Sequence, residues 1–135
     1  MSPLSSEVRD MILKKIVLRT NDGFSQAIEE WAKNKNIETS FFDGKESLFD
    51  TVDSLVILHE DHNISKDVKE LRDALEKLHK STHQIDINAT MNAAVASLRF
   101  WIENNKPKSV LFVGNDNLTK SQRFTDYLEK LGAVL

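Results

Sequence analysis

Residues 16–31 read IVLRTNDGFSQAIEEW, which joins three aliphatic residues, a short polar turn and the start of an amphipathic helix. The run 16–18 (IVL) is typical of a parallel strand that is buried on both faces. Phe24, Ile28 and Trp31 then recur at helical spacing. A strand that leads through a short turn into a helix is the repeating unit of open α/β sheets. This stretch therefore favours an α/β fold, with the turn at the carboxyl end of the first strand.

The rest of the chain repeats this alternation. Four further strands are predicted at residues 37–42 (IETSFF), 54–59 (SLVILH), 83–87 and 109–113 (SVLFV), with helical periodicity between them. Because crossovers between parallel strands are right-handed, helices should cover both faces of the sheet. We predict a three-layer doubly wound sandwich of about five mostly parallel strands in the order 2-1-3-4-5, plus a short leading helix that ends near Leu13.

The helix that begins near Thr90 differs from the one before it. Its first three turns carry almost no charge, whereas the helix that Ser65 caps has a charged outer side. We therefore expect the later helix to be the more deeply buried of the two. Trp31 and Trp101 both lie on apolar helix faces, which favours core packing, with dimer contact as the alternative for Trp101.

The composition fits one domain, residues 1–135, that can bury a core without disulfides. The net charge of -3 does not favour nucleic acid or an anionic membrane as a partner. The chain has no cysteine, which excludes disulfides and thiolate metal sites and is compatible with a cytoplasmic location. No apolar run approaches the roughly 20 residues of a membrane span.

The expected strand order places a topological switch point between the first and third strands. Ligands of open α/β sheets bind outside the carboxyl ends of the strands at such a point. Asparagine side chains suit polar ligands because they both donate and accept hydrogen bonds. The candidate ligand-binding residues are Thr20, Asn21, Asp22, Gly23, His59, Glu60, Asn88, Gly114 and Asn115.

Each of these loops also has a purely structural interpretation. Asn and Asp commonly cap helices and form turns, and that interpretation is favoured for residues 20–23, 88–90 and 114–117. The turn T-N-D-G holds one glycine, whereas a dinucleotide or P-loop cradle needs several. The predicted rim is polar and nearly free of cations. These features disfavour binding through standard phosphate motifs.

The sequence His59-Glu60-Asp61-His62 is the densest ionisable cluster of the chain. An H-x-x-H pair with His83 as a third ligand would suit zinc or nickel. Nothing in the spacing positions that third ligand, so a solvated loop is favoured and no metal site is predicted. A phosphoacceptor domain is rejected as well. The first turn offers only Asp22, the third strand ends in His59, and the residues directly after the fifth strand (Gly114-Asn115-Asp116) include no lysine.

Three segments resemble a known superfamily. They are IVLRTNDGFSQAIEEWAKNKNI, DSLVIL, and HQIDIN followed by AAVASLRFWIENNKPKSVLFVGNDN. They are similar to the Rossmann-like superfamily of molybdenum-cofactor carrier proteins and lysine-decarboxylase-like (LOG-type) nucleotide-binding proteins. The resemblance implies a Rossmann-like domain with a nucleotide-like ligand at the first turn. The glycine-rich loops and the catalytic glutamate motif of LOG-type phosphoribohydrolases are absent here, which argues against that activity.

We therefore expect a non-catalytic protein that binds a nucleotide-like or other small polar ligand at the carboxyl edge, with no cofactor identified. One alternative is a degenerate interaction module that dimerises, as a possible homodimer, or binds another protein through an apolar patch near the leading helix or Trp101. Another is an N-glycosyl hydrolase or deoxyribosyltransferase-like enzyme that uses Glu60 or Asp22 as its carboxylate.

Overall fold

The computed structural model describes residues 13, 15–19, 22–41, 52–61 and 63–134. The predicted leading helix, the turn residues Thr20 and Asn21, and His62 lie outside these residues.

The described residues form a five-stranded sheet in which all neighbouring strands are parallel. Its strands are β1 (Lys15–Leu18), β2 (Glu38–Phe41), β3 (Ser54–His59), β4 (Ser81–Asp86) and β5 (Val110–Gly114). The helices are α2 (Gly23–Asn34), α4 (Lys66–Lys77), α5 (Met91–Asn105) and α6 (Gln122–Val134), and the 3₁₀ turn η1 (Asp116–Lys120) precedes α6. The predicted α/β class is confirmed.

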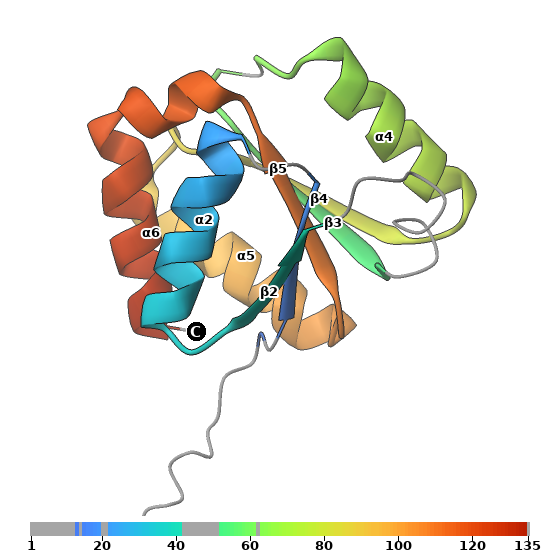
Figure 1. Cartoon of the computed structure of the whole chain (residues 1–135), viewed down its shortest axis with the longest axis horizontal. Coiled ribbons are helices and arrows are strands. Elements are labelled where there is room, and N and C mark those ends of the chain that lie inside the picture. The colour runs from blue at the N-terminus through green and yellow to red at the C-terminus, as the bar shows by residue number, and fades with distance from the viewer. Residues whose placement is uncertain (1–12, 14, 20–21, 42–51, 62, 135) are drawn as a thin grey trace, which may run out of the picture.

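Helices cover both faces of the sheet, as a doubly wound fold requires (Figure 1). The side chains of α2, α5, η1 and α6 share one hydrophobic core with the strands. Those of α4 form a separate core on the opposite face, around Val68, Leu71 and Leu75. The chain moves in one direction along the sheet from β1 to β2 and from β4 to β5, and in the other from β3 to β4. Right-handed crossovers therefore place α2 and α5 on the same face and α4 on the other.

The predicted strand order 2-1-3-4-5 is wrong, because the observed order is β2-β1-β5-β3-β4. β5 pairs with both β1 and β3, so it lies at the centre of the sheet. An interior parallel strand is buried on both faces and is therefore mainly apolar. β5 (VLFVG) and β3 (SLVILH) meet this requirement, whereas β2 (ETSF) and β4 (STHQID) are partly exposed and form the two edges.

The expectation that α5 is the more deeply buried helix is also wrong. Only Ala94, Val95, Leu98 and Ile102 of α5 are buried, and its opposite side is exposed. A helix on one face of a sheet turns its other side outward, whatever residues lie there. Trp31 is buried as expected and donates from Nε1 to the Leu128 carbonyl oxygen at 2.8 Å, which joins α2 to α6.

None of the helices in the described part of the chain combines the length and the apolar character needed to cross a membrane.

Candidate functional site

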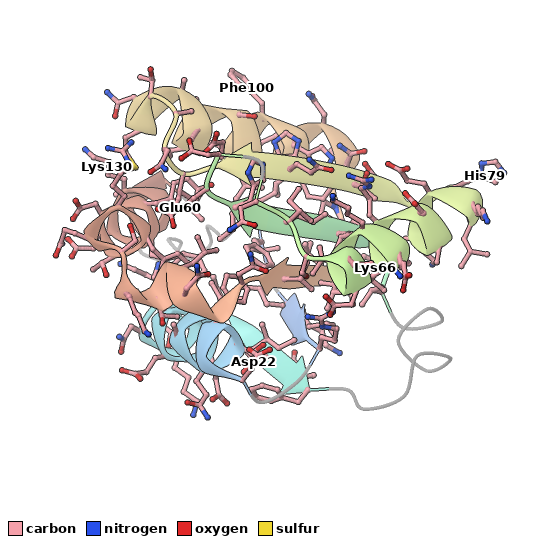
Figure 2. All side chains as sticks on the ribbon, turned by 90° about the horizontal axis from the view of Figure 1, so that it is seen from above. Asp22, Glu60, Lys66, His79, Phe100 and Lys130 are labelled. Atoms are coloured by element: carbon pink, nitrogen blue, oxygen red, sulfur yellow. The ribbon has the colours of Figure 1, made fainter. Side chains whose placement is uncertain are left out.

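The carboxyl ends of β1, β3, β4 and β5 lie at one edge of the sheet, because the strands are parallel. Figure 2 views this edge from above, with Asp22 at the start of α2, Glu60 after β3 and Lys66 at the start of α4. The predicted loops after β1, β3, β4 and β5 therefore share one edge. The contacts within and between them show what each candidate residue does in the fold.

Asp22 and Gly23 form the start of α2. Asp22 has extended backbone angles, and its Oδ1 accepts a hydrogen bond from the Ser25 backbone N at 2.8 Å. This is the geometry of an N-cap, which satisfies one of the backbone N–H groups that a helix start leaves without a partner. Gly23 is the first residue of the helix. The structural interpretation of this turn thus accounts for the position of the Asp22 carboxylate.

Arg19, which the sequence did not single out, joins the end of β1 to the start of α4. Its Nη1 lies 2.7 Å from Asp67 Oδ2. The Ser65 hydroxyl donates to the other carboxylate oxygen of Asp67 at 2.5 Å. The hydrogen bond from Ser65, together with the charge and hydrogen bond of Arg19, lowers the pKa of Asp67 below its ordinary value. The first crossover connection and α4 are therefore tied together at this edge.

His59 and Glu60 end β3 in different environments. The His59 side chain is buried, and its backbone carbonyl accepts from the Ile87 N at 2.8 Å. Glu60 is half-buried, and its carbonyl accepts from the Asn63 N at 2.9 Å. The polar loop that the sequence predicted after the third strand is thus partly enclosed.

The loops after β3 and β4 are joined by Asp61, Asp86 and Asn88. Asp86 Oδ1 accepts hydrogen bonds from the Asp61 N at 3.1 Å and the Asn88 N at 2.9 Å. The Asn88 side chain then donates from Nδ2 to Asp61 Oδ2 at 3.1 Å. Asp61 has a φ of 52°, a left-handed conformation that aspartate tolerates better than most residues. The candidate residue Asn88 thus bridges two neighbouring loops.

Asn115 makes the corresponding bridge between the loops after β5 and β3. Its Nδ2 donates to the Asn63 carbonyl oxygen at 3.0 Å. The preceding residue, Gly114, lies against α2. A Cβ at this position would meet ring atoms of Phe24 at 2.5 Å and 2.9 Å. The close approach of Phe24 therefore accounts for the glycine independently of any ligand.

Arg123 is a second cation at this edge that the sequence did not single out. It lies in the first turn of α6, and its Nε donates to the Ile87 carbonyl oxygen at 2.9 Å. Its Nη2 donates to the Ala89 carbonyl oxygen at 2.8 Å. Arg19 and Arg123 therefore add two cations to an edge that the sequence predicted to be nearly free of them. No local pattern indicates these contacts, because the partners are 36 and 34 positions away.

The observed strand order moves the switch point. β1 and β3 are not neighbours, since β5 lies between them. The chain leaves β5 towards η1 and α6 on one face of the sheet, and it leaves β3 towards α4 on the other. The connections therefore diverge between β5 and β3, where Asn115 meets the Asn63 carbonyl.

Within the described residues, no group of three or more His, Cys, Asp or Glu side chains is arranged to hold a metal ion. His62, half of the H-x-x-H pair, lies outside them. Among the described residues, the contacts of the His83 ring are with α5 rather than with this loop. The ring stacks on Trp101, with 5.5 Å between ring centroids, and its Nε2 lies 2.9 Å from Ser97 Oγ.

Comparison with protein families, with curated proteins and with solved structures finds no match to this chain.

Proposed function

We propose that this protein binds a small polar or nucleotide-like ligand at the carboxyl edge of its sheet and does not catalyse a reaction. The ligand would lie over the divergence between β5 and β3, which is the place where open α/β sheets bind their ligands. Asn115 would be the central contact, with Asn88 and Glu60 beside it.

The observation that carries this proposal is the hydrogen bond from Asn115 Nδ2 to the Asn63 carbonyl, which spans the switch point. A side-chain amide can give up one acceptor for another at little net cost, because one hydrogen bond replaces another. Its Oδ1 can accept at the same time. Asn115 is therefore suited to the mixed donors and acceptors of a nucleobase, an amide or a sugar.

The charges at this edge narrow the class of ligand. Both arginines are already engaged, Arg19 by Asp67 and Arg123 by two backbone carbonyls. The carboxylates of the described edge are Asp22, Glu60, Asp61, Asp67 and Asp86. Lys66 at the start of α4 adds one exposed cation, but these five carboxylates still outnumber the two arginines and Lys66. A polyphosphate would therefore meet net negative charge at the described edge. We therefore propose recognition through a base, sugar or amide group rather than through phosphate.

A ligand screen tests the proposal directly. Purified protein would be screened by thermal shift against nucleosides, nucleoside monophosphates and nucleoside triphosphates, and binders measured by calorimetry. We expect nucleosides to bind at least as tightly as the matching triphosphates. Asn115→Ala should weaken binding roughly 3- to 10-fold, the value of one hydrogen bond.

Asn105→Ala is the matched control. Asn105 Nδ2 also donates to a backbone carbonyl, that of Trp101 at 2.8 Å, but it lies at the last turn of α5, away from the carboxyl edge. Affinity should be unchanged in this variant. Equal affinity in Asn115→Ala and the parent protein would place the ligand elsewhere, and no binding to any member of the panel would remove the proposal.

Two further expectations from the sequence remain part of this proposal. They are a cytoplasmic location and a relationship to Rossmann-like nucleotide-binding proteins.

A further inference from the structure

The two helices α4 and α5 present opposite kinds of surface to solvent. All seven exposed residues of α4 are charged: Lys66, Asp67, Lys69, Glu70, Asp73, Glu76 and Lys77. Of the eight exposed residues of α5, Arg99 alone is charged, and the others are Asn92, Ala93, Ala96, Ser97, Phe100, Asn104 and Asn105. The composition of α4 is that of a permanently solvated helix face. That of α5 is not.

Phe100 is the residue of this face that differs most from the charged residues of a solvated helix. Its exposed fraction is 64%, the highest of the large hydrophobic residues in the described chain, and it lies on the outer side of α5 (Figure 2). Burying a phenylalanine side chain gains about 1.5–3 kcal/mol relative to leaving it exposed. A single exposed hydrophobic residue is ordinary by itself. Phe100, however, also lines a groove, which makes it a candidate for contact with a partner.

A groove of about 600 Å³ runs between α5 and α6 next to Phe100. Its lining includes the apolar side chains of Ala96, Phe100 and Ala133, and its rim carries Arg99, Glu103 and Lys130. Trp101, the residue that the sequence suggested for a dimer contact, lies differently. It is partly buried, and its Nε1 donates to Ser81 Oγ at 3.0 Å. The apolar surface of α5 is therefore centred on Phe100.

The rim charges indicate which partner fits. Arg99 and Lys130 are positive and Glu103 is negative, so the rim carries both signs. Glu103 pairs with Arg99 of the same helix at 3.2 Å, and Lys130 makes no ion pair with any described residue. In a two-fold dimer the same patch meets itself, so Lys130 of one copy can face Glu103 of the other. Phe100 can likewise enter the groove of the second copy while its own groove receives the second Phe100.

The size of the face is compatible with a dimer of modest affinity. α5 and α6 hold 15 and 13 residues, so each is about 20 Å long and about 10 Å wide. Together they offer roughly 400 Å² per copy, or about 800 Å² in total, which is below the usual range for stable complexes. The small residues Ala93, Ala96 and Ser97 allow the facing helices to approach closely.

We infer that the α5–α6 face is a homodimer interface, with Phe100 of each copy seated in the α5–α6 groove of the other. This interface is separate from the carboxyl-edge ligand site and does not depend on it.

Sedimentation velocity over protein concentrations from about 1 μM to 1 mM tests the inference, because a small interface is expected to form a weak complex that is populated only at high concentration. The parent protein should shift from monomer to dimer. Phe100→Glu should weaken association at least tenfold, because it places a charge in an apolar groove. Leu78→Glu is the matched control. Leu78 is also exposed, at 52%, but lies at the end of α4 on the opposite face, so this variant should dimerise like the parent.

Charge reversal gives a second, independent readout. Glu103→Lys and Lys130→Glu should each weaken the dimer, whereas the double variant should recover most of the affinity because it restores opposite charges across the two-fold axis. Circular dichroism would confirm that all variants fold, as expected for substitutions at the surface. A parent protein that stays monomeric at 1 mM overturns the inference. A dimer that Phe100→Glu leaves intact also overturns it. So does a dimer whose affinity Leu78→Glu reduces as much as Phe100→Glu does.

Discussion

At the scale of single residues, Gly114 shows how a position can be essential to packing while it resembles part of a ligand loop. It ends the central strand β5, and the ring of Phe24 occupies the space that a side chain at 114 would need. Phe24 is buried, and its ring lies 5.7 Å from that of Phe124 in α6. The ring therefore has little freedom to move away.

We predict that Gly114→Ala destabilises the protein by about 1–3 kcal/mol, the usual cost of overpacking a closed core. Urea unfolding measures the change. The companion variant Gly114→Ala/Phe24→Leu should recover part of the loss, because the smaller side chain leaves room for the added methyl group. An unchanged free energy of unfolding in Gly114→Ala would show that the core accommodates the added methyl group. Packing would then not explain the glycine, and Gly114 would again be a candidate for ligand contact.

At the scale of elements, the start of α2 depends on a side chain that sequence patterns place equally well in a ligand site. Asp22 accepts the Ser25 N–H in the manner of an N-cap. A carboxylate there also interacts favourably with the positive end of the helix dipole. The stability of α2 is therefore linked to the residue that the enzymatic alternative assigned as a catalytic carboxylate.

Substitution of Asp22 separates these roles. Asp22→Ala should destabilise the protein by about 1 kcal/mol, whereas Asp22→Asn should be nearly neutral because asparagine caps helices as well as aspartate does. The free energy of unfolding in urea provides the test. If Asp22→Asn proved as damaging as Asp22→Ala, the charge rather than the cap would be the important property.

The predicted elements themselves are largely confirmed. Residues 54–59 were predicted as a strand and form β3. Ser65 holds the N-cap position of α4 as predicted, but its side chain makes no capping hydrogen bond and donates to the Asp67 carboxylate instead. These features depend on local patterns of apolar residues and capping residues. The spacing Thr119-x-x-Gln122 is that of a capping box and predicts that the last helix begins at Thr119, but Thr119 lies in η1 instead. α6 begins at Gln122, and Ser121 Oγ accepts from the Arg123 N at 3.2 Å. A local pattern can identify a helix while placing its first turn too early.

At the scale of the whole molecule, His83 couples the packing of α5 on the edge strand β4 to pH. Its ring stacks on Trp101 and lies 2.9 Å from Ser97 Oγ, both in α5. Burial lowers the pKa of His83 below its ordinary value of 6.5, because the charged imidazolium loses hydration there. The unfolded chain therefore takes up a proton at a higher pH than the folded protein does.

This difference sets the sign of the pH dependence. As the pH falls through 6.5 towards the lower folded pKa, the unfolded state binds more protons, so the contribution of His83 to stability decreases. We predict that the free energy of unfolding falls more steeply between pH 7.5 and 5 in the parent than in His83→Gln, which can keep a hydrogen bond to Ser97. Identical slopes in the two proteins would contradict this assignment.

The sequence by itself determined the alternation of strands and helices, the parallel sheet with helices on both faces, and the polar character of the loops at one edge. Each of these follows from periodicity within about 20 residues, where burial of one face or both faces leaves a visible pattern. The polarity of STHQID and the apolar run VLFVG also held the information that β4 is an edge strand and β5 a central one.

Only the tertiary structure decided which strands are neighbours, and with them the position of the candidate site. The insertion of β5 between β1 and β3 moved the switch point to Asn115 and Asn63, 52 positions apart in the chain. The tertiary structure also decided the contact between Arg19 and Asp67 and the exposure of the largely uncharged side of α5. Such pairings depend on contacts between segments that are distant in the chain. The sequence pattern of a segment shows how deeply that segment is buried, but it does not show which other segment packs against it.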